Sequence, residues 1–237
     1  MPAIPAAASQ SSFRESRREL TSVLAPIERR CLIWMAERLP PFINSDHLTI
    51  LALVSLVVAG ACYALTPVWP AAPDFVVVCL AANWFGDSLD GTVARVRRQP
   101  RPRYGFYVDH VVDAIGAASL LGGLALSGFM APVVALALLS AYLLLCVEVF
   151  LASQTIGTFT MSYFGVGPTE LRILLALGTL AVSSHPAPVI AGHAVRLFDL
   201  GGVIGACGLV ATFLRAAFVH TRMLARAEPR PTAPKAA

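Results

Sequence analysis

The sequence predicts an all-α integral membrane protein that crosses the bilayer six times, and three observations support this prediction. Of its 237 residues, 57% are hydrophobic and only 14% are charged, whereas soluble domains carry about 25% charged residues. The mean hydropathy is strongly positive, at +0.70. Six apolar runs follow one another along the chain, most of them close to the length of a membrane-spanning helix.

The six expected spans suit one helical bundle rather than several domains. We expect helices over His47–Leu65, Ala71–Val96, Tyr104–Gly128, Ala131–Ser153, Thr169–Ser183 and Asp199–Arg222. Prolines fall at or near most of these ends, where a residue that cannot continue a helix is expected. The fifth run is the shortest of the six.

The distribution of arginine predicts the orientation of the bundle. The segment before the first span, the loop after the second span and the C-terminal tail are rich in arginine. The loops after the first and third spans have no basic residue. By the positive-inside rule, both termini and the loop after the second span are cytoplasmic, and we expect a bacterial inner membrane protein.

The stretch Phe13–Leu39 combines charged residues with apolar residues at helical spacing. This pattern predicts an amphipathic helix that lies on the membrane surface, with a cytosolic helix packed on the bundle as the alternative. The first thirty residues contain no apolar core of a signal peptide. The last residues are rich in Pro and Ala, and we expect them to be disordered.

Four aspartates interrupt the second and third expected spans: Asp87, Asp90, Asp109 and Asp113. A carboxylate in the bilayer costs about 2.5–3.5 kcal/mol on insertion scales, so four of them require compensating positive charge. Residues three, four or seven apart share one face of a helix. One stripe of the second span therefore holds Asp87, Asp90, Gly91 and Ala94. One face of the third span holds Gly105, Asp109 and Asp113.

The chemistry of this cluster favours hard divalent cations, because oxygen ligands suit Mg²⁺ or Mn²⁺. A pair of such ions clamps a phosphoryl group during its transfer. The glycines and Ala94 leave room for a ligand close to the backbone, and Arg95 lies where a phosphate-rich ligand would enter. Two alternatives remain open here: structural pairing of the acids with arginines, and an ion or proton transporter, since buried acids also mark ion paths.

The acidic segments resemble the signature of the CDP-alcohol phosphotransferase family. The pattern is Asp-x-x-Asp-Gly-x-x-Ala-Arg, then nine residues, then Gly-x-x-x-Asp-x-x-x-Asp. Every fixed position matches: Asp87, Asp90, Gly91, Ala94, Arg95, Gly105, Asp109 and Asp113. The expected six spans and the amphipathic N-terminal helix are also similar to the family.

The resemblance implies transfer of a substituted phosphate from a CDP-linked donor to an alcohol, with release of CMP. It implies that two divalent cations are shared by Asp87, Asp90, Asp109 and Asp113. It implies a CDP site formed by Asp87, Asp90, Gly91, Ala94, Arg95, Gly105 and Asp109. Asp113 is the implied general base for the acceptor hydroxyl.

The preferred donor is CDP-diacylglycerol and the preferred acceptor a small polar alcohol, which makes the product a phospholipid. The alternative is a CDP-choline or CDP-ethanolamine type of reaction on a lipid alcohol, and a metal-binding scaffold without catalysis is a third hypothesis.

By resemblance we expect a homodimer, and we expect no nucleic acid partner. The expected parts are a cytoplasmic segment over residues 1–45, the catalytic bundle over 46–225 and a tail over 226–237.

Two positions depart from common family patterns. Asp46 replaces an asparagine that usually precedes the first span, and we expect it to cap that helix. His110 follows Asp109, as in the choline and ethanolamine branch, but the glycine that follows in that branch is absent. We favour a hydrogen bond from His110 within the bundle over a role in substrate recognition.

Arg172 and Arg215 are the candidates for binding a phosphate on the acceptor. Arg172 begins the fifth span and Arg215 lies in the cytoplasmic half of the sixth. Family members with phosphorylated acceptors place basic residues near these points, and charge-assisted hydrogen bonds would hold the phosphate. The alternative is that Arg172 pairs with Glu170 or Glu148 while Arg215 extends to lipid headgroups.

Overall fold

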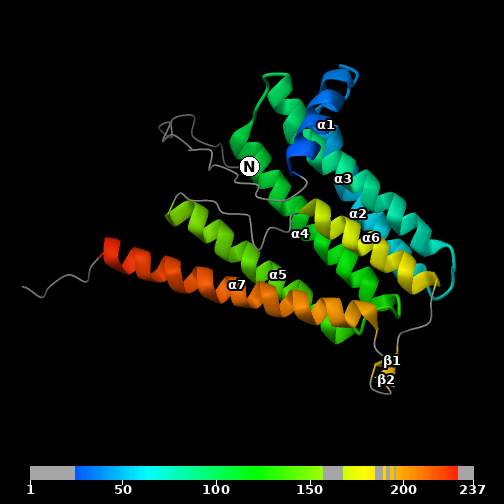
Figure 1. The fold of residues 1–237 in the computed structure, drawn as a ribbon. Helices are drawn as coiled ribbons and strands as arrows, with labels where there is room; N and C mark the ends of the chain where they lie inside the picture. The colour runs from blue at the N-terminus through cyan, green and yellow to red at the C-terminus, as the bar shows by residue number, and fades with distance from the viewer. Residues whose placement is uncertain (1–24, 157–167, 185–188, 191–192, 195, 229–237) are drawn as a thin grey trace, which may run out of the picture.

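The computed structural model describes residues 25–156, 168–184, 189–190, 193–194 and 196–228. The described chain consists of helices apart from one two-stranded antiparallel pair (Figure 1). The elements are α1 (Ala25–Arg38), α2 (Ser45–Leu65), α3 (Ala72–Val96), α4 (Pro102–Leu126), α5 (Pro132–Thr155), α6 (Pro168–Ser184), β1 (Val189–Ile190), β2 (His193–Ala194) and α7 (Leu197–Ala227).

The all-α prediction is confirmed, and each expected span coincides with one of α2 to α7 to within a few residues. Within the described residues, four helices are long and apolar enough to cross a membrane, namely α2, α4, α5 and α7. Helix α6 has only 17 residues, whereas a span needs about 20. Helix α3 carries acidic and basic side chains along its length. Six crossings therefore stay a prediction, while four candidate spans make this an integral membrane protein.

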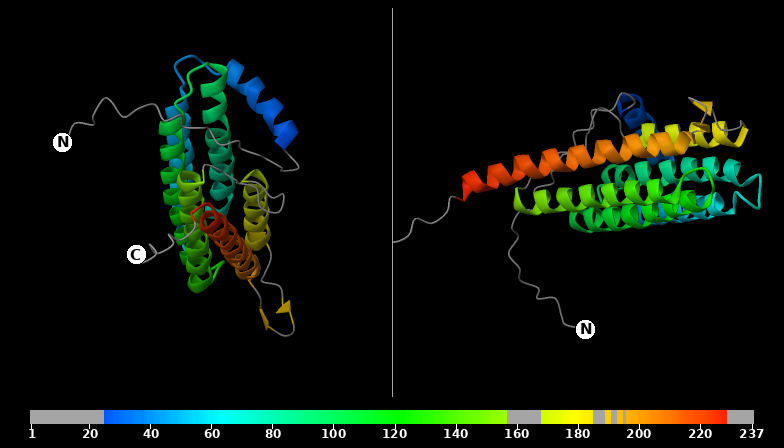
Figure 2. Two further views of the ribbon diagram at one scale, coloured as in Figure 1. Left: turned by 90° about the vertical axis from the view of Figure 1, so that its left-hand side faces the viewer. Right: turned by 90° about the horizontal axis from the view of Figure 1, so that it is seen from below.

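The helices α2 to α7 lie roughly side by side, and the short β pair lies at the opposite end of the bundle from α1 (Figures 1 and 2). Helix α2 contacts α3 and α4, and α4 also contacts α5. Helix α6 packs on the other side of α3, and α7 packs on α5. This order brings the end of α3, the beginning of α4 and the beginning of α6 to one end of the bundle.

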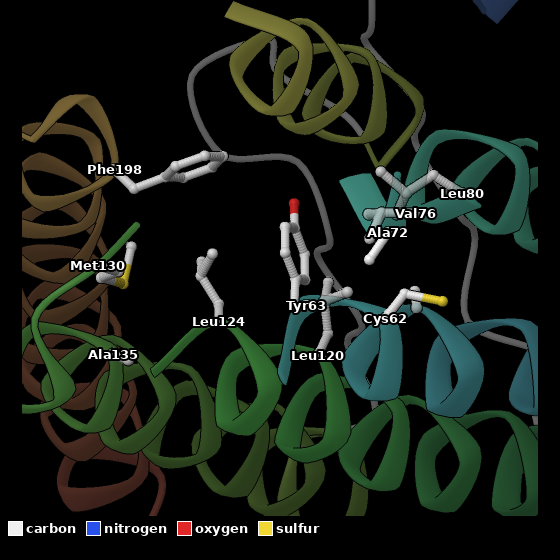
Figure 3. Close-up of a cluster of buried hydrophobic side chains, with 11 residues drawn as sticks. Cys62, Tyr63, Ala72, Val76, Leu80, Leu120, Leu124, Met130, Ala135 and Phe198 are labelled. Atoms are coloured by element: carbon white, nitrogen blue, oxygen red, sulfur yellow. The ribbon is translucent and has the colours of Figure 1, made fainter. Parts of the chain in front are cut away.

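The main apolar core lies between α2, α3, α4 and α7, and Figure 3 shows its central side chains. Tyr63 of α2 is fully buried and points toward α6. Its hydroxyl forms a hydrogen bond of 2.6 Å with the hydroxyl of Thr179 on α6, which is also fully buried. Phe198 of α7 meets the Tyr63 ring edge-on, with 6.4 Å between the ring centroids. A polar pair thus links α6 to an otherwise apolar core.

Glycines allow α2 and α4 to approach until their backbones touch. A methyl group on Gly123 of α4 would overlap the carbonyl of Gly60 on α2. A methyl group on Gly60 would overlap the carbonyl of Ser119 on α4. Helix α3 approaches α2 in a similar way, since a Cβ on Gly86 would lie 2.6 Å from the carbonyl oxygen of Leu48. These contacts fix α3 and α4 on either side of α2.

The N-cap of α2 is Asn44, and the prediction that Asp46 caps this helix is wrong. The Asn44 side chain accepts a hydrogen bond of 3.0 Å from the backbone N–H of His47. The His47 ring in turn accepts from the backbone N–H of Asn44, which completes a capping box. Asn44 has the extended backbone that an N-cap requires, whereas Asp46 already lies in the first turn.

Helix α1 represents the described part of the expected surface helix, and residues 13–24 of that prediction lie outside the described residues. Leu32 and Ala36 are buried in a second core cluster with α2 and α3. Ile27 and Trp34, one heptad apart, are 72% and 56% exposed. One face of α1 therefore packs on the bundle, which agrees with the alternative of a helix packed on the bundle. Another face exposes apolar side chains. Contact with the membrane surface stays a prediction.

Candidate active site

The four aspartates of the motif lie in the second half of α3 and the first half of α4, at the end of the bundle next to α1. Asp90 is buried at 8% exposure. One of its oxygens accepts a hydrogen bond of 2.8 Å from the Thr49 hydroxyl of α2, and the other accepts from the backbone N–H of Gly91. The negative charges of Asp109 and Asp87 both act on Asp90. The Asp90 carboxylate of α3 thus lies near enough to that of Asp109 on α4 for their charges to interact.

A cavity of about 730 Å³ opens beside Asp90. Six of the seven residues expected at the nucleotide site line it, namely Asp90, Gly91, Ala94, Arg95, Gly105 and Asp109. Its remaining wall includes residues before α2, in α2, in the basic loop and at the start of α4: Asn44, Asp46, Thr49, Arg97, Arg101 and Tyr104. Asp87, the seventh, is not part of this wall. The cavity is large enough for a small-molecule ligand.

The small residues of the motif keep this cavity open. A Cβ at Gly105 would meet nothing within 4 Å, so it would project into open space. A Cβ at Gly91 would come within 3.3 Å of the Arg95 guanidinium. Arg95 donates a hydrogen bond of 3.2 Å to the Thr92 hydroxyl of its own helix, which directs the guanidinium along α3. Cationic and backbone groups therefore line a space that bulkier side chains would reduce.

Two arginines of the basic loop bind the segment before α2 and form one side of the cavity. The Arg97 guanidinium donates to the carbonyls of Leu39 and Pro40, both at 3.0 Å, and to that of Ile43. Arg101 forms an ion pair with Asp46 and lies over the Tyr104 ring, 4.1 Å from its centroid. The sequence shows that this loop is rich in arginine. It does not show which groups the arginines bind, because their partners lie far away in the chain, before α2 and in its first turn.

Asp87 faces away from the cavity, toward α6. Its Oδ2 accepts a hydrogen bond of 2.6 Å from Nη2 of Arg172, whose Nε donates to Oδ1 of Asn83 at 2.7 Å. The Asn83 amide is held in place because it donates to the carbonyl of Ala52 on α2 at 3.0 Å. The Arg172 side chain is 16% exposed and that of Asp87 is 37% exposed, so the ion pair is only partly shielded from water. The structure thus places the candidate acceptor residue Arg172 beside the acidic cluster.

Asp113 lies one turn after Asp109 on α4, and it is not among the residues that line the cavity. It is close enough to Tyr142 and Cys146 of α5 for its charge to act on both side chains. Asp90 and Asp109 therefore line the cavity, Asp87 pairs with Arg172 of α6, and Asp113 lies near α5. Sequence analysis missed Tyr142, because nothing in an apolar run distinguishes a tyrosine near an acid from one in a core.

Three further candidates lie outside this cluster. Glu148 is buried at 8% exposure and accepts a hydrogen bond of 2.5 Å from His220 of α7, so its partner here is not Arg172. The His110 ring is tilted against Phe106 and meets Phe150 edge-on, and Nδ1 donates to the Phe106 carbonyl, which is the within-bundle role that the sequence favoured. Arg215 lies exposed on α7, and its role in acceptor binding stays a prediction.

The four aspartates of the motif fit divalent cations by their chemistry, because carboxylate oxygens are the ligands these ions prefer and these carboxylates are partly or fully buried. Within the described ranges, no three acidic, histidine or cysteine side chains converge on one point. The hydrogen bonds give the reason: Asp87 is oriented by Arg172, and Asp90 by Thr49 and Gly91. Asp87 and Asp90 therefore bind protein groups in this structure with the oxygens that would bind a metal.

Comparison with known proteins agrees with this geometry. A family model described as CDP-alcohol phosphatidyltransferase matches residues 42–215, which include the four aspartates, the cavity and Arg172. A search of curated proteins gives no match to this chain.

Proposed function

Since the chain belongs to the CDP-alcohol phosphatidyltransferase family, we propose that it transfers a phosphatidyl group from CDP-diacylglycerol to a small polar alcohol and releases CMP. The family carries out transfer from a CDP-alcohol to an alcohol, so the chain is a membrane-embedded transferase of lipid biosynthesis. The observation that best supports the particular reaction is the cavity, where carboxylates, backbone and arginine surround a space of about 730 Å³.

The cavity is the proposed site of the CDP half of the donor. Gly91, Ala94 and Gly105 leave the backbone accessible, and Arg95 offers a guanidinium for bidentate hydrogen bonds to phosphate. The diphosphate would lie toward Asp90 and Asp109, which are the acids that line this space. Asp87 contributes from the far side of the cluster, through its charge and through any cation shared with Asp90.

The side that faces α5 and α6 is the proposed acceptor site. Asp113 would accept the proton of the acceptor hydroxyl as its oxygen attacks the β-phosphorus. A new oxygen–phosphorus bond forms, the bond between the β-phosphorus and the bridging oxygen breaks, and CMP leaves with that oxygen. Arg172 and Tyr142 lie on this side and would orient the acceptor. We retain Arg215 as a second proposed contact for an acceptor phosphate.

The family uses divalent metal ions, and we propose that Asp87, Asp90, Asp109 and Asp113 hold two of them, Mg²⁺ or Mn²⁺. When bound, such ions neutralise the diphosphate and stabilise the leaving oxygen. The placement in a bacterial inner membrane, the cytoplasmic orientation of the site and both termini, and a homodimeric assembly are further parts of the proposal. They rest on the arginine distribution and on family resemblance.

A CMP-release assay on the full chain in lipid nanodiscs tests this function. CDP-diacylglycerol is supplied with Mg²⁺ or Mn²⁺ and a panel of small polar alcohols, with and without a phosphate group, and CDP-choline with diacylglycerol is run in parallel. We expect CMP release with CDP-diacylglycerol and one class of acceptor. Release only in the parallel reaction would replace the proposed donor. Absence of CDP binding in the presence of both metals would favour ion transport instead.

A further inference from the structure

Glu28 of the surface helix α1 accepts hydrogen bonds from two other helices through a single oxygen. Its Oε1 accepts from Nε1 of Trp84 on α3 at 2.7 Å and from the hydroxyl of Thr169 on α6 at 2.7 Å. The hydroxyl of Ser88 on α3 lies 3.4 Å from the same oxygen. Glu28 is only partly exposed, so these hydrogen bonds to a charged acceptor are sheltered from water.

The donors to Glu28 adjoin the residues that hold the Arg172–Asp87 pair. On α3, Trp84 and Ser88 form the stripe next to the one that carries Asn83 and Asp87. On α6, Thr169 lies one turn before Arg172 and shares its face. Two elements are thus linked twice: Glu28 accepts from Thr169 of α6 and lies near Ser88 of α3, and Arg172, one turn after Thr169, binds Asp87, the neighbour of Ser88.

These links matter because they act on the first turn of α6. Helix α6 has 17 residues, and its main contacts are with α3. Its buried polar contact with α2, through Thr179, lies about three turns further along. The first turn of α6 is therefore held against α3 by Arg172 from one side and by the Glu28 carboxylate from the other.

We propose that Glu28 is a positioning residue for the acceptor side of the site: it fixes the first turn of α6 so that Arg172 is held on Asp87. This inference rests on the proposed function, because it gives α1 a part in the same reaction. Glu28 itself does not touch the reacting groups. Removal of its carboxylate leaves the Trp84 and Thr169 donors without their shared acceptor and loosens the start of α6.

The test compares Glu28→Ala, Glu28→Gln and Thr169→Val in the full chain, with Glu37→Ala as the matched control. Glu37 lies on the same helix but is exposed. Amide hydrogen exchange is measured by mass spectrometry on peptides that cover residues 168–176. We expect Glu28→Ala to raise exchange there about tenfold, the equivalent of about 1.4 kcal/mol of local opening. Glu28→Gln should raise it less, because the amide oxygen still accepts a hydrogen bond, and Glu37→Ala should leave it unchanged.

Thr169→Val keeps Glu28 in place and removes only the α6 donor, so it tests the link without disturbing α1. Unchanged exchange over residues 168–176 in both Glu28→Ala and Thr169→Val would overturn the proposal. An equal rise in every helix would also overturn it, because Glu28 would then serve general stability. These outcomes do not depend on turnover, so they decide the role of Glu28 even if no acceptor supports CMP release.

Where the panel yields an active acceptor, kinetics separate positioning from general damage. Glu28→Ala should raise the KM for that acceptor by about fivefold while the affinity for CDP with Mg²⁺ stays at the parent value. Glu28→Gln should restore part of the acceptor affinity. A loss confined to CDP affinity, or an equal loss for both ligands, would contradict the assignment of Glu28 to the acceptor side.

Discussion

Nη2 of Arg172 on α6 lies 2.6 Å from Oδ2 of Asp87 on α3, and this ion pair joins two elements that are 85 positions apart in the chain. Its guanidinium is oriented a second time by Asn83. The pair satisfies an aspartate that would otherwise be an unpaired charge in a largely apolar bundle. A divalent cation that binds Asp87 must share this carboxylate with Arg172 or displace it. The affinity of the site for a divalent cation therefore depends on this competition.

Arg172→Ala should increase the affinity for Mn²⁺ in the absence of substrates by about tenfold, because the Asp87 carboxylate then has no arginine guanidinium that competes with the metal. The same variant should turn over more slowly, since the proposed acceptor contact is lost. Mn²⁺ binding is measured by electron paramagnetic resonance titration. Arg215→Ala is the control and should leave Mn²⁺ affinity unchanged, and equal affinities in all three proteins would show that Arg172 does not compete with metal.

Asp113→Asn should reduce turnover by about 10²–10⁴-fold, the usual contribution of a positioned proton acceptor. CDP binding should be largely retained, because Asp113 is not among the residues that line the cavity. CMP release and equilibrium CDP binding are measured on the same preparation. Asp74→Asn, an exposed aspartate in the first turn of α3, is the control. Retained activity in Asp113→Asn would refute its assignment as the base.

Asp87→Asn should weaken metal and CDP binding together. An amide provides a weaker oxygen ligand than a carboxylate, and Asp87 is close enough to Asp90 for their charges to interact. The measurement is the Mg²⁺ concentration needed for half-maximal CDP binding, which should rise several-fold. An unchanged metal requirement would count against Asp87 as a ligand and leave it only the pairing with Arg172.

The hydrogen bond between Tyr63 and Thr179 offers a test of the core. Thr179→Val should lower stability by about 1–3 kcal/mol, because it leaves a buried hydroxyl without its partner. The double variant with Tyr63→Phe should be less destabilised than the sum of the two single changes, since both polar groups are then absent. Thermal unfolding of the purified proteins provides the comparison. Strict additivity would mean that the two hydroxyls do not stabilise each other.

Gly123→Ala should destabilise the bundle strongly, because the added methyl group overlaps the carbonyl of Gly60. The control is its neighbour Gly122, where an added Cβ meets nothing within 4 Å. Thermal stability in detergent should therefore fall for Gly123→Ala and stay near the parent value, or rise slightly, for Gly122→Ala. Equal behaviour of the two variants would show that α2 and α4 do not touch at this point.

The helices could be predicted well because hydropathy and proline placement are properties of each segment alone. The expected spans match α2 to α7 in position, and Asp90 of α3 and Asp109 of α4 line one cavity because helical periodicity fixes which residues share a side. The open space follows from the same logic, since Gly91, Ala94 and Gly105, which also line it, are small.

Contacts between distant segments could not be predicted in this way. Nothing near Arg172 in the sequence identifies Asp87 as its partner, and nothing near Glu28 points to Thr169. These pairs depend on which helices become neighbours in space. Asp46 shows a different limit: both it and Asn44 are good caps, and the backbone, which turns helical one residue after Asn44, decides between them.

Helix α7 has a further consequence for how the protein sits in lipid. Its 31 residues extend over about 46 Å, whereas the hydrocarbon layer is about 30 Å thick. Arg196 precedes one end, and Arg222 and Arg226 occupy the other. Charged residues at both ends restrict the movement of α7 along the membrane normal. This helix, the longest of those described, therefore fixes the depth of the neighbouring helices in the bilayer, and thereby the level at which a membrane-borne substrate must arrive.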